Sequence, residues 1–226
     1  MKRGFTLSEV LITLGIVGVV AVLTVPSVMR NYRNRLYVSQ LQKTYSQLSD
    51  SVQAIMRDEN VDNFYESTAF LDGKVDATGK GTEGFARFMS EYFKVNKYDC
   101  ARKTPYCVAD SYSTLSGNAV GGLSTWYCVQ TVNGATLCPG KSAADKRIDM
   151  YIDVNGSAAP NVGGRDLFLV SIKPDGTVSD YVNKWGITWY EGSGYPANSC
   201  STGSGLSGAA RGCLNAIIDA GWKMEY

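Results

Sequence analysis

The sequence has no histidine, which limits the chemistry that its side chains can do. Histidine is the usual general base of enzymes and a frequent ligand of metal ions. The string Gly205-Leu206-Ser207 begins like the nucleophile elbow of a hydrolase, but Ala209 stands where that motif has its last glycine. Because no histidine can activate Ser207, a serine hydrolase is excluded. No other catalytic constellation is visible, so we expect a protein that is not an enzyme.

A second glycine-rich string, Gly203 to Gly208, fits the pattern Gly-x-Gly-x-x-Gly of dinucleotide-binding proteins. In those proteins the string follows a strand directly, because the turn brings the phosphates to the start of a helix. No convincing strand precedes Gly203 in this sequence. We therefore interpret the string as a flexible loop, and we expect no nucleotide and no other cofactor.

Oxygen-bearing side chains on a glycine-rich stretch form a candidate calcium site, at Asp153, Asn155 and Asp166. Carboxylate and amide oxygens are the ligands that Ca²⁺ prefers. The stretch is not an EF-hand, because Ala158 occupies the position of the glycine in that loop. Asn, Gly and Asp are also the residues that form turns. We favour a structural turn cluster and no metal, with calcium as the weaker alternative.

Glu9 is the carboxylate with the least ordinary surroundings, because an uncharged run from Val10 to Met29 follows it directly. At about 1.5 Å per residue, this run makes a helix of roughly 30 Å, which matches the hydrocarbon core of a bilayer. An ionisable group at the edge of such a helix is costly unless it is paired, so Glu9 is a functional candidate. The alternative is a plain signal anchor with Glu9 at the membrane interface.

The order of parts at the N-terminus differs from that of an ordinary secretory signal, in which small residues for cleavage follow the apolar core. Here Gly4 lies between the basic start and the apolar run, so a cut there leaves the helix on the mature protein. The pattern resembles the class III signal of type IV pilins and of the pseudopilins of type II secretion. The residues that carry this resemblance are Gly4, Phe5, Thr6, Leu7, Ser8, Glu9 and Pro26.

The resemblance implies a processing step and an assembly role. Prepilin peptidase would cut after Gly4 and methylate the new amino group of Phe5, which stays cationic. The carboxylate of Glu9 would pair with that group on a neighbouring subunit and set the axial register. Pro26 matches the helix-loosening proline of the family. Some pseudopilins bind calcium in a loop, and some prepilin-like proteins share an Asp-x-Asn-Gly signature with the stretch that begins at Asp153.

A second helical pattern follows the apolar run. Apolar residues recur every three or four positions among polar ones, which predicts one buried stripe on a wet helix. We expect a single helix of roughly 80 Å from Phe5 to about Arg57, with a kink or a looser turn at Pro26. A coiled coil is the alternative, although the pattern is short for one. The stripe consists of Val38, Leu41, Tyr45, Leu48, Val52 and Ile55.

Six cysteines on a chain with an export signal indicate disulfides formed in an oxidising compartment. None falls in a Cys-x-x-Cys pair, and sequence alone leaves the pairing open. We favour the sequence-neighbour pairs. A three-residue turn, Val132-Asn133-Gly134, would place Cys128 directly across a hairpin from Cys138, whereas a two-residue turn would not. The six are Cys100, Cys107, Cys128, Cys138, Cys200 and Cys213.

The rest of the chain predicts an antiparallel sheet with short helices. We expect a loop over 58–81 and then a short helix capped by Thr82, with Phe85, Phe88, Met89, Tyr92 and Phe93 on one face. The expected strands are 124–131, 135–138, 147–154 with one wet face, 167–172 as a central strand, and 177–182. A final helix, 209–220, would bury Cys213, Leu214, Ile217 and Ile218 and stop at Gly221.

The implied fold is α+β: a pilin-like lollipop with a long N-terminal helix packed on an antiparallel sheet and disulfide-tied loops outside. We divide the chain into a leader, 1–4, a transmembrane and polymerisation segment, 5–29, and a periplasmic or extracellular head, 30–226, that includes the amphipathic part of the helix. The protein would sit in the inner membrane as a single-pass subunit before assembly. Afterwards it would lie in a periplasmic or cell-surface filament.

The function implied is a structural subunit of a type IV pilus or of a type II secretion pseudopilus. Its partners would be pilin-like subunits of the same or another kind, prepilin peptidase and an inner-membrane assembly platform. The alternative is a minor tip pilin whose head binds a ligand such as DNA or a surface. Without Lys2 and Arg3, 20 basic side chains face 21 acidic ones. This near-neutral balance argues against nucleic acid.

Overall fold

The computed structural model describes residues 6–142, 147–181, 200, 203 and 205–226. The chain forms two compact units, one up to Leu36 and one from Tyr37 to Tyr226. Helix α1, Leu7–Asp58, begins in the first unit and ends in the second. It continues through Pro26 without a break in helical structure. The expected loosening at Pro26 stays a prediction.

The first unit is a solvent-exposed apolar helix. From Thr6 to Leu36, its side chains pack against no other layer, as Leu7 at 77% and Leu23 at 73% exposure illustrate. Among the described residues, α1 is the one helix that is long and apolar enough to cross a membrane. Exposed apolar surface of this extent needs a cover, because burial of one large aliphatic side chain contributes about 1.5–3 kcal/mol.

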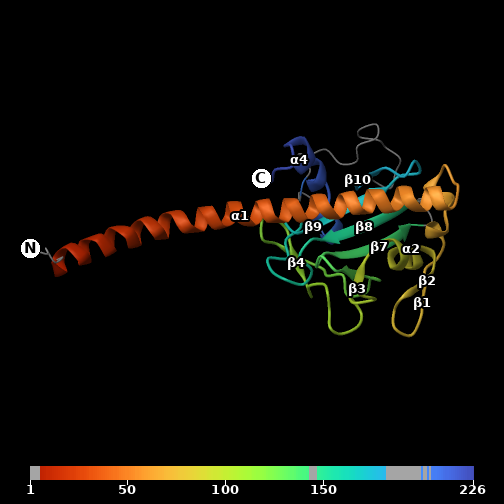
Figure 1. Cartoon of the computed structure of the whole chain (residues 1–226), viewed down its shortest axis with the longest axis horizontal. Coiled ribbons are helices and arrows are strands. Elements are labelled where there is room, and N and C mark those ends of the chain that lie inside the picture. The colour runs from red at the N-terminus through yellow and green to blue at the C-terminus, as the bar shows by residue number, and fades with distance from the viewer. Residues whose placement is uncertain (1–5, 143–146, 182–199, 201–202, 204) are drawn as a thin grey trace, which may run out of the picture. The chain divides into compact units, whose positions relative to one another are not determined.

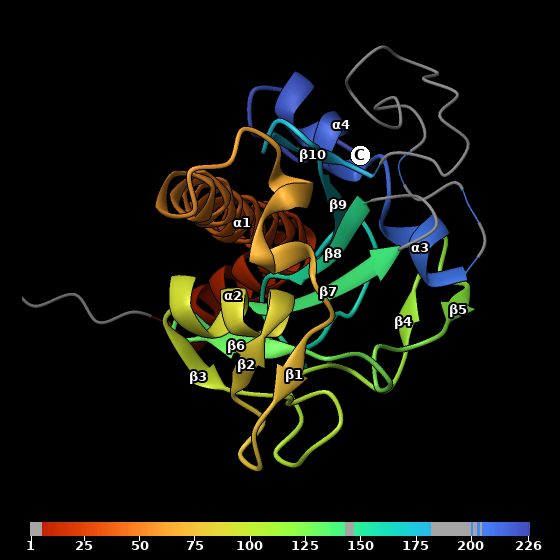
Figure 2. The ribbon, with the colours of Figure 1, turned by 90° about the vertical axis from the view of Figure 1, so that its right-hand side faces the viewer.

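The second unit is built on a six-stranded antiparallel sheet in the order β10-β9-β8-β7-β6-β3 (Figures 1 and 2). Helices and loops cover both of its faces. The α+β fold expected from the sequence is therefore confirmed. The strands are β3 Val95–Lys97, β6 Val129–Thr131, β7 Thr136–Ser142, β8 Arg147–Asp153, β9 Leu167–Ile172 and β10 Val178–Asp180.

The C-terminal part of α1, from Tyr37, packs on one face of this sheet. The stripe predicted from the spacing is buried there, with Leu41, Leu48 and Val52 fully inaccessible. Tyr45 is half-buried and its hydroxyl donates to the carbonyl of Val178 at 3.0 Å. The stripe meets residues of the sheet that share one face: Val129, Leu137, Ile148, Met150, Ile152, Phe168, Val170 and Ile172.

The other face of the sheet is covered as well at Tyr151 and Asp153, with Asp149 partly exposed, which corrects the expectation of a wet face on strand 147–154. Tyr151 and Asp153 of β8 are 6% and 0% exposed. A second apolar cluster, which includes Tyr112, Leu123 and two disulfides, covers them. The alternation of residues in this strand thus separates an apolar face against α1 from a more polar face against the second cluster. Strand β9 is buried along its whole length, as expected, but it lies next to the edge strand β10 instead of at the centre.

The hairpin between β6 and β7 has the predicted turn. Val129 pairs with Leu137, which puts Cys128 across from Cys138. The amide of Thr131 donates to Ala135, and Gly134 has a left-handed φ of 90°. The three-residue turn is thus confirmed. The first strand is shorter than expected, because a turn at Leu123–Trp126, closed by a backbone bond of 2.9 Å, precedes it.

Residues 58–81 are more ordered than the expected loop. They contain two 3₁₀ turns, Phe64–Glu66 and Thr68–Phe70, and the short strand β1, Lys74–Val75. Strand β2, Gly81–Glu83, follows and includes Thr82, so the expected cap at Thr82 is wrong. Helix α2, Gly84–Tyr92, begins after Glu83 without a side-chain cap. Phe88, Met89 and Phe93 are buried as predicted, whereas Phe85 and Tyr92 are half-buried.

The expected C-terminal helix, 209–220, is two helices: α3, Gly205–Ala210, and α4, Cys213–Asp219. The chain turns between them at Gly212, whose φ of 74° a glycine adopts without strain. Ile218 lies at the surface with 37% exposure, so its predicted burial is wrong, while Leu214 and Ile217 are buried. A small two-stranded sheet, β4 Tyr112–Ser113 and β5 Ala119–Val120, lies near α3 (Figure 2).

Candidate assembly site and disulfide framework

Glu9 closes a capping box at the start of α1. Its Oε2 accepts hydrogen bonds from the amide and the hydroxyl of Thr6, both at 2.8 Å, and the Glu9 amide donates to the Thr6 hydroxyl at 3.2 Å. Such reciprocal bonds satisfy amides that the first helical turn leaves without partners. The Thr-x-x-Glu spacing is a known signature of this box, so the sequence contained the signal that our interpretation missed.

The second oxygen of the Glu9 carboxylate, Oε1, takes no part in the capping box. Among the described residues, both bonds to the carboxylate go to Oε2, and Oε1 accepts none. A carboxylate has about four acceptor positions. Capping and pairing with an external cation are therefore compatible. Gly4 and Phe5, the residues predicted for cleavage and methylation, lie outside the described residues.

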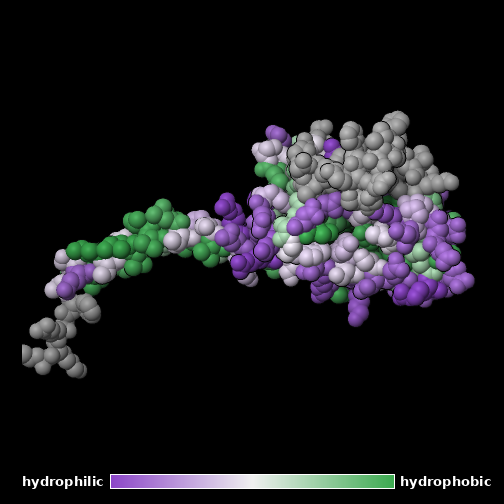
Figure 3. Space-filling model, turned by 90° about the horizontal axis from the view of Figure 1, so that it is seen from above, coloured by the Kyte–Doolittle hydropathy of each residue, from purple (hydrophilic) through white to green (hydrophobic). Residues whose placement is uncertain are grey.

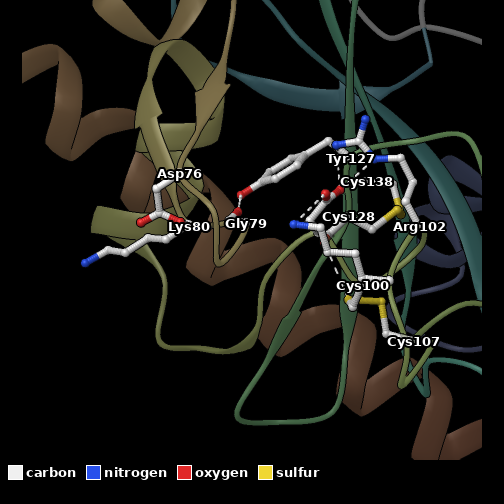
Figure 4. Close-up of polar contacts among 11 residues, drawn as sticks. Asp76, Gly79, Lys80, Cys100, Arg102, Cys107, Tyr127, Cys128 and Cys138 are labelled. Carbon is white, nitrogen blue, oxygen red and sulfur yellow. Dashed lines mark hydrogen bonds and ion pairs between the residues drawn. A yellow bond between two sulfur atoms is a disulfide. The ribbon is translucent and has the colours of Figure 1, made fainter.

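The cysteines form three disulfides between sequence neighbours: Cys100–Cys107, Cys128–Cys138 and Cys200–Cys213. The first two are adjacent in space, because the amide of Cys100 donates to the carbonyl of Cys128 at 3.0 Å (Figure 4). The hydroxyl of Thr136 in β7 also donates to the carbonyl of Cys107 at 2.9 Å. This framework attaches the loop over 100–107 to the sheet.

The turn between β1 and β2 is attached beside the same framework (Figure 4). The hydroxyl of Tyr127 donates to the carbonyl of Gly79 at 3.2 Å, and burial raises the pKa of Tyr127 to about 12. Within the turn, Asp76 accepts from the amide and hydroxyl of Thr78 and from the amide of Lys80. The hydrogen bond from the hydroxyl of Thr78 lowers the pKa of Asp76. These contacts hold the polar turn against Tyr127.

We predict that the full chain, produced in an oxidising compartment, contains no free thiols. Non-reducing peptide mapping should recover the three neighbour pairs. For Cys128 and Cys138 the reason is their position directly across the hairpin from each other, within disulfide distance. A peptide that joins Cys128 to any cysteine except Cys138 would contradict the hairpin register as well as the pairing. Mapping after full reduction serves as the control.

Donors of the protein itself engage the two candidate aspartates, whereas the Oδ1 of Asn155 is buried and has no hydrogen-bond partner among the described residues. The hydroxyl of Tyr112 donates to Asp153 at 2.6 Å, and the amides of Asn161 and Val162 donate to Asp166 at 2.7 and 2.6 Å. The side-chain amide of Asn155 donates to nearby carbonyls. Burial raises the pKa of both aspartates, which favours their neutral forms. Among the described residues, no group of three or more His, Cys, Asp and Glu side chains is placed to hold a metal. A turn cluster accounts for the bonds of the two aspartates, and the choice between it and calcium stays a prediction.

The glycine-rich string differs from the expected flexible loop, because its residues from Gly205 to Gly208 belong to α3. Gly208 packs closely on Gly203, so that a Cβ on Gly208 would lie 2.4 Å from the Gly203 carbonyl carbon. Gly203 and Gly208 thus allow close packing of the chain on itself. Ser204 lies outside the described residues.

Asp180 organises the C-terminal region, and sequence reasoning missed it. The carboxylate is fully buried at the end of β10. Its oxygens accept the amides of Tyr181 and Gly212 at 2.7 Å and of Asn215 at 3.0 Å. These bonds fix the start of α4, beside the Cys213 disulfide. Burial raises the pKa of Asp180 to about 6. No local sequence signal marks the contact with α4, since Gly212 and Asn215 lie more than 30 residues from Asp180.

Comparison with known proteins identifies the N-terminal segment. A family model described as the prokaryotic N-terminal methylation motif matches residues 1–25, and this motif is the signal of type IV pilins and pseudopilins. The match confirms the resemblance seen in the string from Gly4 to Glu9. No curated protein matches the chain, and no solved structure does either. The match leaves the second unit outside its range.

Proposed function

We propose that this chain is a structural subunit of a type IV pilus or of a type II secretion pseudopilus. The observation that carries the proposal is the methylation motif at residues 1–25, which includes the start of an exposed helix of membrane-spanning length. The motif supports a pilin-like or pseudopilin-like protein, and it points to a structural subunit over an enzyme. The proposal assigns the leader to 1–4, the membrane and polymerisation segment to 5–29, and the head to 30–226.

The proposed mechanism starts in the membrane. The apolar helix holds the subunit in the inner membrane until prepilin peptidase removes the leader, after which the assembly platform transfers the subunit to the filament. There the apolar side chains of the helix pack against other pilin-like subunits, of the same or of another kind. This step covers the exposed apolar surface of the first unit without lipid.

The proposed role of Glu9 is to select the axial position of each subunit. Cleavage gives Phe5 a cationic amine, which is costly to bury among apolar helices without a counter-charge. The Oε1 atom of Glu9 is available for it, because the capping bonds occupy only Oε2. An axial offset between subunits that leaves the amine of Phe5 unpaired therefore costs free energy. The helix assembly thus gains a register that apolar packing alone does not give.

Processing at Gly4 is the direct test of the signal. Co-expression of the full chain with a prepilin peptidase should yield a product that starts at methylated Phe5, as intact-mass measurement would show. Gly4→Val should block the cut, because a side chain keeps the peptidase from the bond. Gly15→Ala is the matched control and should be cut normally, since a Cβ at Gly15 meets nothing within 4 Å. An uncut chain, or a cut beyond Val25, would contradict a class III signal.

A further inference from the structure

Three arginines follow the apolar run directly and have no acidic partner in the sequence around them. Between Glu9 and Asp50 the chain has no acidic residue, yet Arg30, Arg33 and Arg35 lie within six positions. All three are exposed on α1. In the part of the chain that the structure describes, every ion pair involves other residues. Within the described residues the cluster therefore has no counter-charge of its own.

The cluster lies at the depth of lipid headgroups when the apolar run spans a bilayer. At about 1.5 Å per residue, Arg30 to Arg35 occupy the first ~9 Å beyond Met29. The polar layer of a bilayer extends about 5–8 Å beyond the hydrocarbon on each side. Figure 3 shows the apolar part of the helix followed by a hydrophilic band. The helix thus changes from apolar to basic at the depth where a membrane changes from hydrocarbon to phosphate groups.

The three guanidinium groups surround the helix. With about 100° per residue, Arg30, Arg33 and Arg35 project at about 0°, 300° and 140° around the axis, and Tyr32 projects at about 200°. A single protein partner contacts one side of a helix, and it would leave part of such a ring in water. A layer of headgroups encloses the helix on all sides. The angular distribution therefore favours lipid as the occupant.

The chemistry of the ring fits the same ligand. Guanidinium groups bind phosphate oxygens through two parallel hydrogen bonds. Tyr32 is 63% exposed, and tyrosine is enriched at membrane interfaces because its ring is amphipathic. Removal of Lys2 and Arg3 with the leader would leave the basic charge on the head side of the membrane. Membrane proteins usually carry their excess of Lys and Arg on the cytoplasmic side, so basic charge on the head side calls for a specific reason.

We propose that Arg30, Tyr32, Arg33 and Arg35 form a basic belt that binds anionic phospholipid headgroups in the leaflet on the head side of the membrane. The inference rests on the membrane-inserted stage of the proposed function. The belt fixes the depth of the subunit before assembly, because movement along the membrane normal separates the guanidinium groups from the phosphates. Extraction into a filament then exchanges these lipid contacts for contacts with other subunits.

The test compares lipid binding by the full-length protein in detergent, titrated with phosphatidylglycerol or with phosphatidylcholine of the same acyl chains. Native mass spectrometry counts the bound lipids. The wild type should prefer phosphatidylglycerol, and added salt should weaken that preference. Each basic residue near an anionic surface contributes about fivefold in affinity, so the triple variant Arg30→Gln, Arg33→Gln and Arg35→Gln should bind phosphatidylglycerol about 100-fold more weakly. Its binding of phosphatidylcholine should not change.

A matched control removes the same charge from the head. Lys80, Lys94 and Lys97 are each replaced by Gln, and this variant should keep the preference for phosphatidylglycerol.

A triple arginine variant that keeps the preference for phosphatidylglycerol, or a wild type without that preference, would overturn the proposed belt. So would an arginine variant that keeps the preference but no longer co-purifies with pilin-like subunits, because the ring would then be a protein contact. Resistance to carbonate extraction reports membrane insertion separately. Its loss in the wild type would overturn the proposed function instead.

Discussion

Full-length protein with Glu9→Gln should enter the membrane and lose its leader like the wild type, yet it should be absent from filaments. Glutamine occupies the same position of a capping box as glutamate, so the bonds from Thr6 are retained. What the variant loses is the negative charge that the cationic amine of a neighbouring Phe5 needs when it is buried. We expect the subunit in the inner-membrane fraction and none in the sheared filament fraction.

Two further substitutions separate charge from capping. Glu9→Leu removes both and should also fail to assemble, whereas Glu9→Asp keeps the charge with a shorter reach and should assemble partly. The measurement belongs in a strain without wild-type copies, because wild-type filaments can carry a few altered subunits. If Glu9→Gln subunits enter filaments while Glu9→Leu subunits do not, Glu9 acts through the helix cap. The proposed role in register would then be wrong.

Asp180→Ala should cost about 3 kcal/mol in the free energy of unfolding. It removes the acceptor of three amides, among them that of Gly212, which is buried, and each such loss costs about 1–3 kcal/mol before relaxation. Asp175→Ala is the matched control, because Asp175 accepts the Thr177 amide in an exposed turn of the adjacent β-hairpin. It should cost under about 1 kcal/mol. Urea unfolding of the full chain in detergent, followed by tryptophan fluorescence, measures both.

The same carboxylate should give the protein a pH dependence of known sign. Burial raises the pKa of Asp180 to about 6, above its value of about 3.9 in an unfolded chain, so folding takes up a proton between these values. The resulting stability is fully present below pH 4 and is lost as the pH rises through 6, by about 3 kcal/mol at most. Asp180→Asn should remove this contribution from the slope.

Unfolding free energies of both proteins between pH 4 and 7 test this expectation. Asp153 and Asp166 also have raised pKa values and contribute to the slope with the same sign, so only the difference between the two proteins isolates Asp180. Equal slopes in the wild type and in Asp180→Asn would show that the carboxylate stays ionised throughout this range. Its three backbone amides would then outweigh the effect of burial.

Features that depend on neighbouring residues were readable in the sequence. The string from Gly4 to Glu9 identifies the N-terminal signal, since a peptidase reads a contiguous segment. The buried stripe at Leu41, Leu48 and Val52 follows from the helix period, and the turn at Val132–Gly134 follows from the need to bring Cys128 and Cys138 together. The capping box of Thr6 and Glu9 was equally local, and we passed over it in favour of the intermolecular role.

The tertiary structure decided what covers each face and where distant segments meet. The alternation in β8 shows which side chains are polar, but the segment from Cys100 to Trp126, together with α3, covers the second face and buries Tyr151 and Asp153. The break at Gly212 depends in the same way on Asp180, 32 residues earlier. Sequence periodicity reports the faces of an element and not the layer that packs on them, because that layer comes from residues far along the chain.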